Sequence, residues 1–169
     1  MLVLEGTASV KGIAAGMKGI VEAAAKMGIE LKVGAGAEAV GAAANVGNLF
    51  ASGGAAAGTA AHAGAAAEVV SKVSGQQILK AIVDSDASGD GAEPGAANGP
   101  IDAAIGAADG AGGDFANAGM TGNDKIAAAI VLRGMAKDGK FALAQDQAVG
   151  VVAGVKSTVY DCFLDFQNK

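Results

Sequence analysis

The stretch NDKIAAAIVLRGMAKDGKF, residues 123–141, decides the fold. Its seven consecutive apolar residues run from Ile126 to Leu132, and at 100° per residue they occupy every side of an α-helix. A helix that is apolar all round must be largely buried. The stretch therefore predicts a buried framework helix that other helices surround.

Residues that favour helix ends stand on both sides of this run. Asn123 or Thr121 is expected to cap its start, and Gly139 is expected to stop it. The charges just inside these ends suit the helix dipole: Asp124 at the start, Arg133 and Lys137 at the end.

The segment GMAKDGKF, residues 134–141, has the glycine and lysine spacing of a phosphate-binding loop. Such a loop needs a strand before it and a helix N-terminus after it, so that backbone N–H groups converge on the anion. Here Gly134 to Lys140 lies at the C-terminus of the predicted helix, where free carbonyls repel phosphate. Phe141 also stands where Ser or Thr would bind magnesium. The segment therefore predicts the last turn and cap of a helix, and no nucleotide.

The composition favours an all-α fold. Of the 169 residues, 42 are Ala and 28 are Gly, and Trp is absent. Ala is the best helix former, whereas the β-branched and aromatic residues that strands prefer are thinly spread. Each Gly inside a helix costs about 1 kcal/mol relative to Ala. We expect one domain of short helices that approach closely because their side chains are small.

Other helices can be placed around the framework helix. Residues 9–27 carry an apolar face and end before Gly28, and their Gly12, Gly16 and Gly19 are interpreted as a site of close helix packing. The run SGQQ, residues 74–77, is a capping box that opens an amphipathic helix ending near Asp84. A further short helix is expected to begin at Pro100. Residues 34–67 are compatible with helix, but their boundaries are not readable.

Two glycine-rich segments predict exposed, flexible loops. Residues 84–99, DSDASGDGAEPGAANG, form an acidic loop, and residues 110–122 form a second loop whose charge is Asp114. The first resembles a calcium-binding loop only in part, because Ser88 replaces a ligand and Gly95 stands where a bidentate Glu is needed. No metal site is predicted there.

The charges and reactive residues exclude several classes of function. The net charge is −5, and no run of Lys and Arg is long enough to follow a nucleic-acid backbone. The single His62 and the single Cys162 cannot assemble a zinc site of the usual kind or an intrachain disulfide. We expect His62 on the surface or a helix flank and Cys162 as a free thiol. No catalytic, cofactor-binding or metal-binding residue is predicted, and no cofactor.

Three segments carry a resemblance to a known family. The segment MTGNDKIAAAIVLRGMAKDGKFALA, residues 120–144, closely resembles the invariant region of the variable large proteins of borrelial spirochetes, which include antigenic-variation surface lipoproteins. Residues 74–85 and 98–110 resemble further framework segments of the same family. The resemblance covers most of residues 5–144.

This resemblance implies an α-helical, antigenically variable lipoprotein at the surface of the cell outer membrane. Members of the family carry a lipid anchor, and recombination with silent copies changes their loops so that host antibodies lose their target. The implied partners are host antibodies, engaging the loops at residues 84–99 and 110–122, and the membrane through the anchor. A surface adhesin for a host protein or glycan is the alternative. The sequence leaves open a homo-oligomer and an unexpressed silent copy.

The two ends of the chain depart from the family pattern. The start MLVLEGTASVKG, residues 1–12, has neither the secretory signal nor the lipid-bearing Cys of exported members. The tail STVYDCFLDFQNK, residues 157–169, contains no Ala or Gly. It is interpreted either as frame-shifted or foreign sequence or as a terminal helix with one apolar face. We therefore expect a helical domain over residues 1–156 and an atypical tail over residues 157–169.

Overall fold

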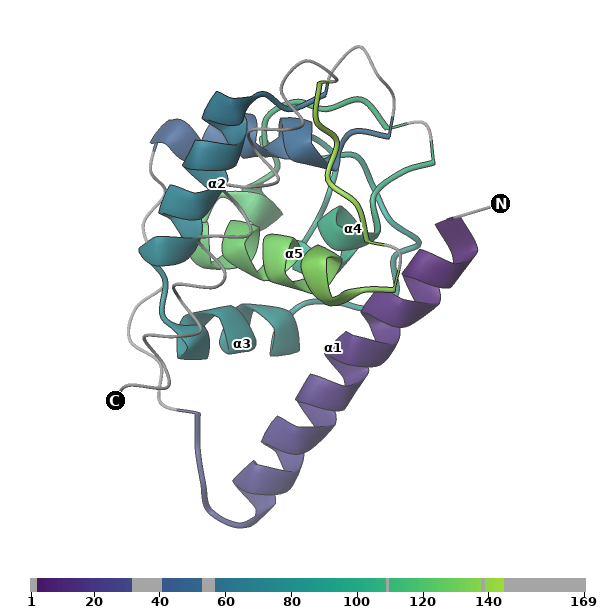
Figure 1. The fold of residues 1–169 in the computed structure, drawn as a ribbon. Coiled ribbons are helices and arrows are strands. Elements are labelled where there is room, and N and C mark those ends of the chain that lie inside the picture. The colour runs from purple at the N-terminus through teal and green to yellow at the C-terminus, as the bar shows by residue number, and fades with distance from the viewer. Residues whose placement is uncertain (1–2, 32–40, 53–56, 109, 138, 145–169) are drawn as a thin grey trace.

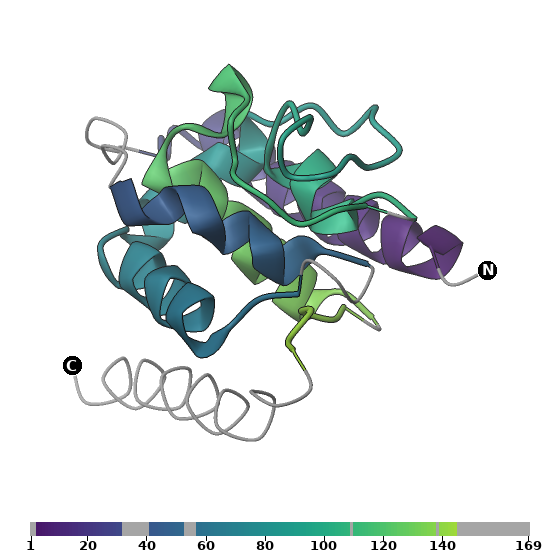
Figure 2. The same ribbon diagram turned by 90° about the horizontal axis from the view of Figure 1, so that it is seen from above.

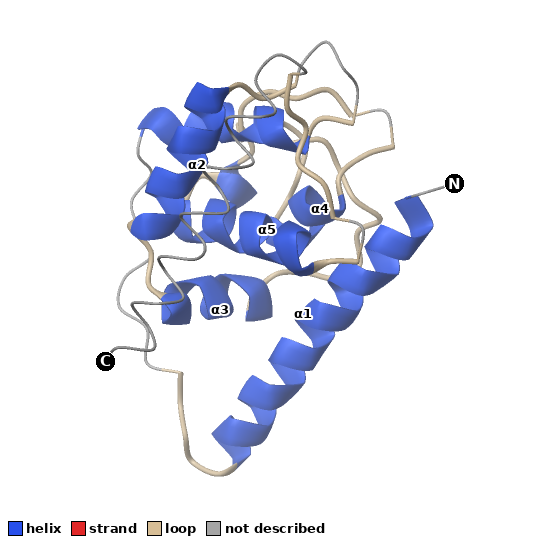
Figure 3. Ribbon diagram, viewed as in Figure 1, coloured by secondary structure: helices blue, strands red, loops and turns tan. Residues whose placement is uncertain are grey.

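A computed structural model describes residues 3–31, 41–52, 57–108, 110–137 and 139–144. Cys162 and the predicted tail, residues 157–169, lie outside the described residues. The described residues form helices joined by loops, and their one β-type contact is an isolated bridge between Gly58 and Leu143 (Figure 3). The all-α prediction is confirmed.

The framework helix predicted from residues 126–132 is α5, Asn123–Met135. It contacts α1, α2, α3 and α4 and lies between α1 on one side and α2 on the other (Figure 1 and Figure 2). Five of its seven central apolar residues are buried, and Ile130 and Val131 are partly buried. Ala127, Ala128 and Ala129 have no exposed surface, so small side chains lie where the neighbouring helices pack on α5.

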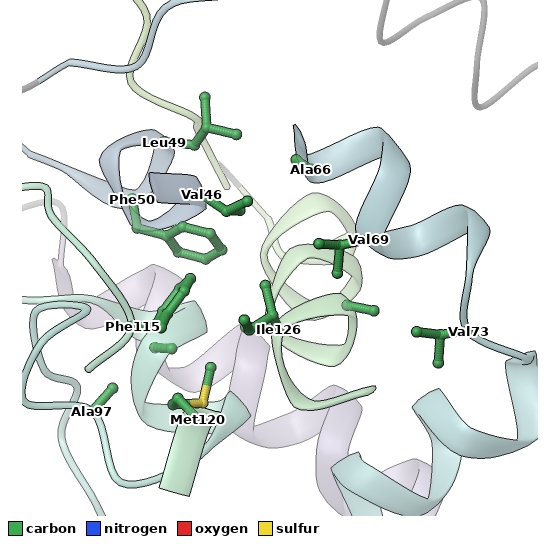
Figure 4. Packing of buried hydrophobic residues seen from close by; sticks show 13 residues of the cluster. Val46, Leu49, Phe50, Ala66, Val69, Val73, Ala97, Phe115, Met120 and Ile126 are labelled. Carbon is green, nitrogen blue, oxygen red and sulfur yellow. The ribbon is translucent and has the colours of Figure 1, made fainter. Parts of the chain in front are cut away.

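Opposite sides of α5 belong to two separate groups of buried side chains. Ile126, Ala127 and Ala129 lie in the larger group, together with residues of η1, α2 and the loops (Figure 4). Ala128 and Leu132 lie in the smaller group, which α1, α3 and α4 complete. We call these groups cluster one and cluster two. Because α5 contributes to both, it joins the two halves of the core.

Two of the helices that contribute to cluster one begin in the Ala/Gly-rich tract with unreadable boundaries. The 3-10 helix η1 spans Gly41–Phe50, and α2 spans Ala60–Ser71. In α2, buried side chains recur at Ala63, Ala66 and Val69, three residues apart along one helical face. This repeat turns one side of α2 toward α5.

The predicted starts of α3 and α4 are confirmed. Helix α3 spans Gly75–Val83, and its N-cap Ser74 exchanges hydrogen bonds with Gln77: Gln77 N–H donates to Ser74 Oγ at 3.2 Å, and Ser74 N–H donates to Gln77 Oε1 at 2.9 Å. Helix α4 spans Pro100–Ile105 and has Pro at its first position, where a missing N–H costs nothing.

Helix α1 differs from its prediction in two ways. It spans Val3–Lys26, so it begins six residues earlier than expected, although Gly28 ends it with a φ of 79° as expected. The interpretation of Gly12, Gly16 and Gly19 as a packing site is wrong, because no described atom lies within 4 Å of a Cβ added at any of them. The packed side of α1 carries Val10 and Ala14 instead.

The ends of α5 also differ from the prediction. Gly122 is the N-cap, because the Thr121 hydroxyl already donates to Ala118 O at 3.2 Å and Asn123 has entered the first turn. The helix stops at Met135, four residues before Gly139. Ala136 is extended there, and the next N–H, of Lys137, donates to Ser9 Oγ of α1 at 2.9 Å. A contact with α1 thus accompanies the early end of the helix.

Candidate functional site

The two predicted loops lie side by side and form one surface, which we call the loop surface (residues 84–99 and 110–122). Asn117 Nδ2 donates to Asn98 Oδ1 at 3.2 Å. Nearby the backbones touch, since a Cβ added at Gly119 would stand 2.0 Å from Asn98 O. Two segments that are separate in sequence are therefore joined in space.

The loops are exposed, as predicted, and a few of their residues are anchored in the core. Pro94 and Ala97 of the first loop are buried, and Phe115 and Met120 of the second are 6% and 0% exposed. Phe115, Met120 and Ala97 belong to cluster one (Figure 4). Residues 118–120 form a short 3-10 helix, η3 (Ala118–Met120), that Asn117 caps. Each loop is fixed in the core only at these few residues, so only they lose their conformational freedom to burial. The side chains between them face outward.

The charged side chains of the loop surface are all acidic. The exposed carboxylates are Asp84, Asp86, Asp90, Glu93 and Asp114. Lys80 Nζ lies 2.5 Å from Asp84 Oδ2, and Lys11 Nζ lies 3.2 Å from Asp90 Oδ1, whose side chain is 96% exposed. Exposed ion pairs of this kind contribute about 0–1 kcal/mol, so these charges shape the surface more than they stabilise the fold.

Asp86 is held in a local turn. Its carboxylate accepts the Ser88 N–H at 2.9 Å and the Ser88 hydroxyl at 2.8 Å. The backbone N–H bond first, and the hydroxyl second, lower the pKa of Asp86 from its ordinary value of 3.8. The acidic surface thus keeps this negative charge at mildly acidic pH.

A hollow of about 480 Å³ lies between the loop surface, α3, the start of α4 and the start of α5, and residues of both loops contribute to its lining. Its charged lining includes Asp84, Asp86, Asp102 and Asp124 together with Lys80 and Lys125. None of its described lining residues is aromatic. The hollow is polar and mixed in charge, and it offers no ring face on which an apolar ligand or a sugar could stack.

Other candidate residues take structural places. His62 lies in the first turn of α2 and its Nδ1 accepts the Thr59 N–H at 3.1 Å, so it serves the helix flank, as predicted. Within the described ranges, no three His, Cys, Asp or Glu side chains gather where they could hold a metal ion. A search of the same ranges finds no helix with the length and apolar character that crossing a membrane requires.

The segment 134–141 lies where the sequence placed it, at a helix C-terminus. Gly134 and Met135 end α5, and the described residues after them form a turn, in which Gly139 N–H donates to Ala136 O at 3.0 Å, and no second helix. Converging N–H groups of a phosphate loop are therefore absent from this part of the described chain. Its residues instead contact their own helix, since a Cβ at Gly139 would stand 1.8 Å from Arg133 O.

Sequence reasoning missed the role of Arg133. Its guanidinium lies over the Phe50 ring at 5.1 Å from the centroid, Nε donates to Lys140 O at 2.6 Å, and Nη1 lies 3.4 Å from Ala104 O. Burial lowers the pKa of this guanidinium. The helix-dipole argument located a favourable cation at this end of α5, but no sequence signal indicated its partners, since they lie on three other segments.

Comparisons with known proteins identify a family and a solved structure to which this chain is similar. The profile of a family described as Borrelia lipoprotein matches residues 4–162. The chain is also similar to the crystal structure of the Lyme disease variable surface antigen VlsE of Borrelia burgdorferi, with 47% sequence identity and a TM-score of 0.79. That similarity covers 90% of this chain and 56% of the VlsE chain, so the chain spans little more than half of that antigen's length. No curated protein sequence matches significantly.

Proposed function

Since the chain belongs to the Borrelia lipoprotein family, we propose that it serves as an antigenically variable component of the bacterial outer surface that evades the host antibody response. The family is one of surface lipoproteins and not of enzymes, and the proposed role is non-catalytic. The same proposal includes attachment of the protein to the outer membrane by a lipid anchor.

One observation supports this role most directly: exposed acidic side chains stand between buried anchors. The anchors Pro94, Ala97, Phe115 and Met120 hold the loop surface to cluster one, while its five carboxylates face outward. Surface substitutions away from structural features change stability by about 0.5 kcal/mol or less. The exposed positions can therefore change without unfolding the domain, which is what an antigen under antibody pressure requires.

The proposed partners are host antibodies, and they would bind the loop surface. Polyclonal antibodies raised against the folded chain provide the test. In a loop variant, Asp86, Asp90, Glu93 and Asp114 are all changed to Asn or Gln, while the anchors and glycines are kept. The matched control is E68Q with K72Q on α2, which removes an ion pair away from the loops.

We expect serum depleted on the loop variant to retain a large part of its reactivity with the original chain, whereas depletion on the control removes nearly all of it. Equal depletion by both variants would contradict the proposed antibody surface. Circular dichroism checks that each variant is folded. On intact cells, antibodies against residues 120–144 should bind less than antibodies against the loop surface, because only Gly134 and Met135 of α5 are exposed.

A surface adhesin is the alternative proposal, and the polar hollow beside α3 is the feature that favours it. A receptor site cannot vary freely, so adhesion should survive exchange of loop residues that do not line the hollow. Saturable binding to host cells that is equal for the original chain and for a variant with only Asp90, Glu93 and Asp114 changed would favour the adhesin. Binding that is lost in this variant would argue against it.

A further inference from the structure

Residues 139–144 cross the surface of the domain as an extended segment, which we call the strap. Backbone hydrogen bonds hold it on Leu49 of η1 and on Gly58: Ala142 N–H donates to Leu49 O at 2.8 Å, Gly58 N–H donates to Ala142 O at 2.9 Å, and Ala144 N–H donates to Gly58 O at 3.0 Å. The bonds run in the parallel pattern of the Gly58–Leu143 bridge. The strap is thus docked by main-chain bonds along one line.

The strap covers buried residues at the end of η1. Phe141 packs edge-on against Phe50 at 5.7 Å between ring centroids, and Leu143 packs on cluster one. Beneath it lie Leu49 and Phe50, which are 5% and 2% exposed. Arg133 reaches from α5 to Lys140 O and completes the closure. The strap therefore seals the contact between η1 and the C-terminal end of α5.

The strap is held less firmly than the helix that it covers. Each of residues 141–144 is only partly buried, whereas Ala127, Ala128, Ala129 and Leu132 in α5 have no exposed surface. Segments with few buried contacts open at a lower free energy than the buried core. Opening the strap breaks three main-chain bonds and one Arg133 bond and leaves the contacts of α5 with α1, α3 and α4 intact.

We propose that the strap is a latch, which opens as a unit while α5 stays folded and thereby controls access to Phe50 and to the C-terminal turn of α5. In the closed state the strap covers Phe50 and the C-terminal turn of α5, and residues 139–144 have one extended conformation. Loop exchange at residues 84–99 leaves this latch unchanged, because none of its bonds involves that loop.

Hydrogen exchange tests whether the latch opens separately. The amides of Gly58, Ala142 and Ala144 should exchange at least about tenfold faster than those of residues 127–132, because the latter wait for the core to open. Equal exchange rates in the two sets would overturn the proposal, since the strap and α5 would then open only together.

The substitution G58A is designed to weaken the latch from the side opposite α5. An added Cβ would stand 2.4 Å from Leu49 Cδ2, which must turn away, and 3.0 Å from Ala142 O, so the strap backbone is pushed outward at this point. The matched control is G64A in α2, where a Cβ meets nothing within 4 Å. We expect exchange at Ala142 and Ala144 to rise about tenfold in G58A alone, with residues 127–132 still protected. A second variant, F141A, removes the ring contact with Phe50 and keeps every main-chain bond.

A Fab fragment raised against a synthetic peptide of residues 133–144 tests access. Its apparent affinity is set by the fraction of molecules that are open, so G58A should raise its affinity by the same factor by which it speeds exchange at Ala142. F141A should move both quantities in the same direction, and G64A neither. A Fab that binds the original chain as tightly as the free peptide would overturn the latch, as would an affinity that stays constant while exchange accelerates.

Discussion

Leu132 is the largest side chain that α5 contributes to cluster two, and it has no exposed surface. Its neighbours come from α1, α3 and α4, so L132A would leave a cavity that no single helix can fill. Leu-to-Ala changes in such places cost about 2–5 kcal/mol. We expect a loss of this size in urea unfolding. The control M135A, at a side chain that is 45% exposed, should change stability by about 0.5 kcal/mol or less.

Asp86 gives a prediction about pH. Its hydrogen bonds from Ser88 favour the carboxylate and lower its pKa below 3.8 in the folded chain. At pH values above the pKa that Asp86 has in the unfolded chain, these hydrogen bonds stabilise the turn. This stabilisation is lost as the pH falls through the lower pKa that Asp86 has in the folded chain. An NMR titration of the Asp86 carboxyl carbon should show a midpoint below 3.8.

The variant S88A separates the two hydrogen bonds that lower the pKa of Asp86. It removes the hydroxyl and keeps the backbone N–H, which is the larger cause, so the midpoint should move only part of the way back to 3.8. A midpoint at the ordinary value in the original chain would show that the turn does not form in solution.

At the scale of elements, α1 carries its glycines on the side that faces away from the described helices. Its C-terminal half extends past the other helices, and Ile20 and Met27 are 72% and 73% exposed (Figure 1). Because a Cβ at Gly16 or Gly19 meets nothing within 4 Å, G16A and G19A should each stabilise the chain by up to about 1 kcal/mol. Thermal unfolding measures this gain.

A loss of stability in these two variants would have a definite meaning. It would show that another element packs on the glycine side of α1, as the small-residue spacing first suggested. The matched substitution G47A provides the contrast, since its Cβ would stand 2.1 Å from Gly113 O and 2.7 Å from Pro94 Cβ. We expect G47A to destabilise the chain and to disturb the loop surface.

At the scale of the whole molecule, α5 links both clusters, so the domain should unfold as one unit. The variant V69A affects cluster one and L132A affects cluster two. Both should lower the midpoint of the same single transition, with equal calorimetric and van't Hoff enthalpies. Two separate transitions in either variant would show that the clusters fold independently.

The sequence alone determined the class of fold, the family and the main helix. Seven apolar residues in a row require burial on all sides, and the capping box at Ser74 and the proline at Pro100 act through neighbours three or four residues away. Such signals are local, so they can be read without knowing which segments meet. The acidic character of residues 84–99 is also a property of composition, and it holds in the structure.

Only the tertiary structure decided where α5 ends, which loops join and which glycines are crowded. Ser9 of α1 binds Lys137 N–H just past the last turn of α5, Asn98 meets Asn117, and Gly119 touches the backbone of Asn98 whereas Gly16 touches nothing. Each of these facts depends on contact between segments far apart in the chain. Glycine has the same local preference at every position, so its neighbours in space, and not its neighbours in sequence, determine whether it is required.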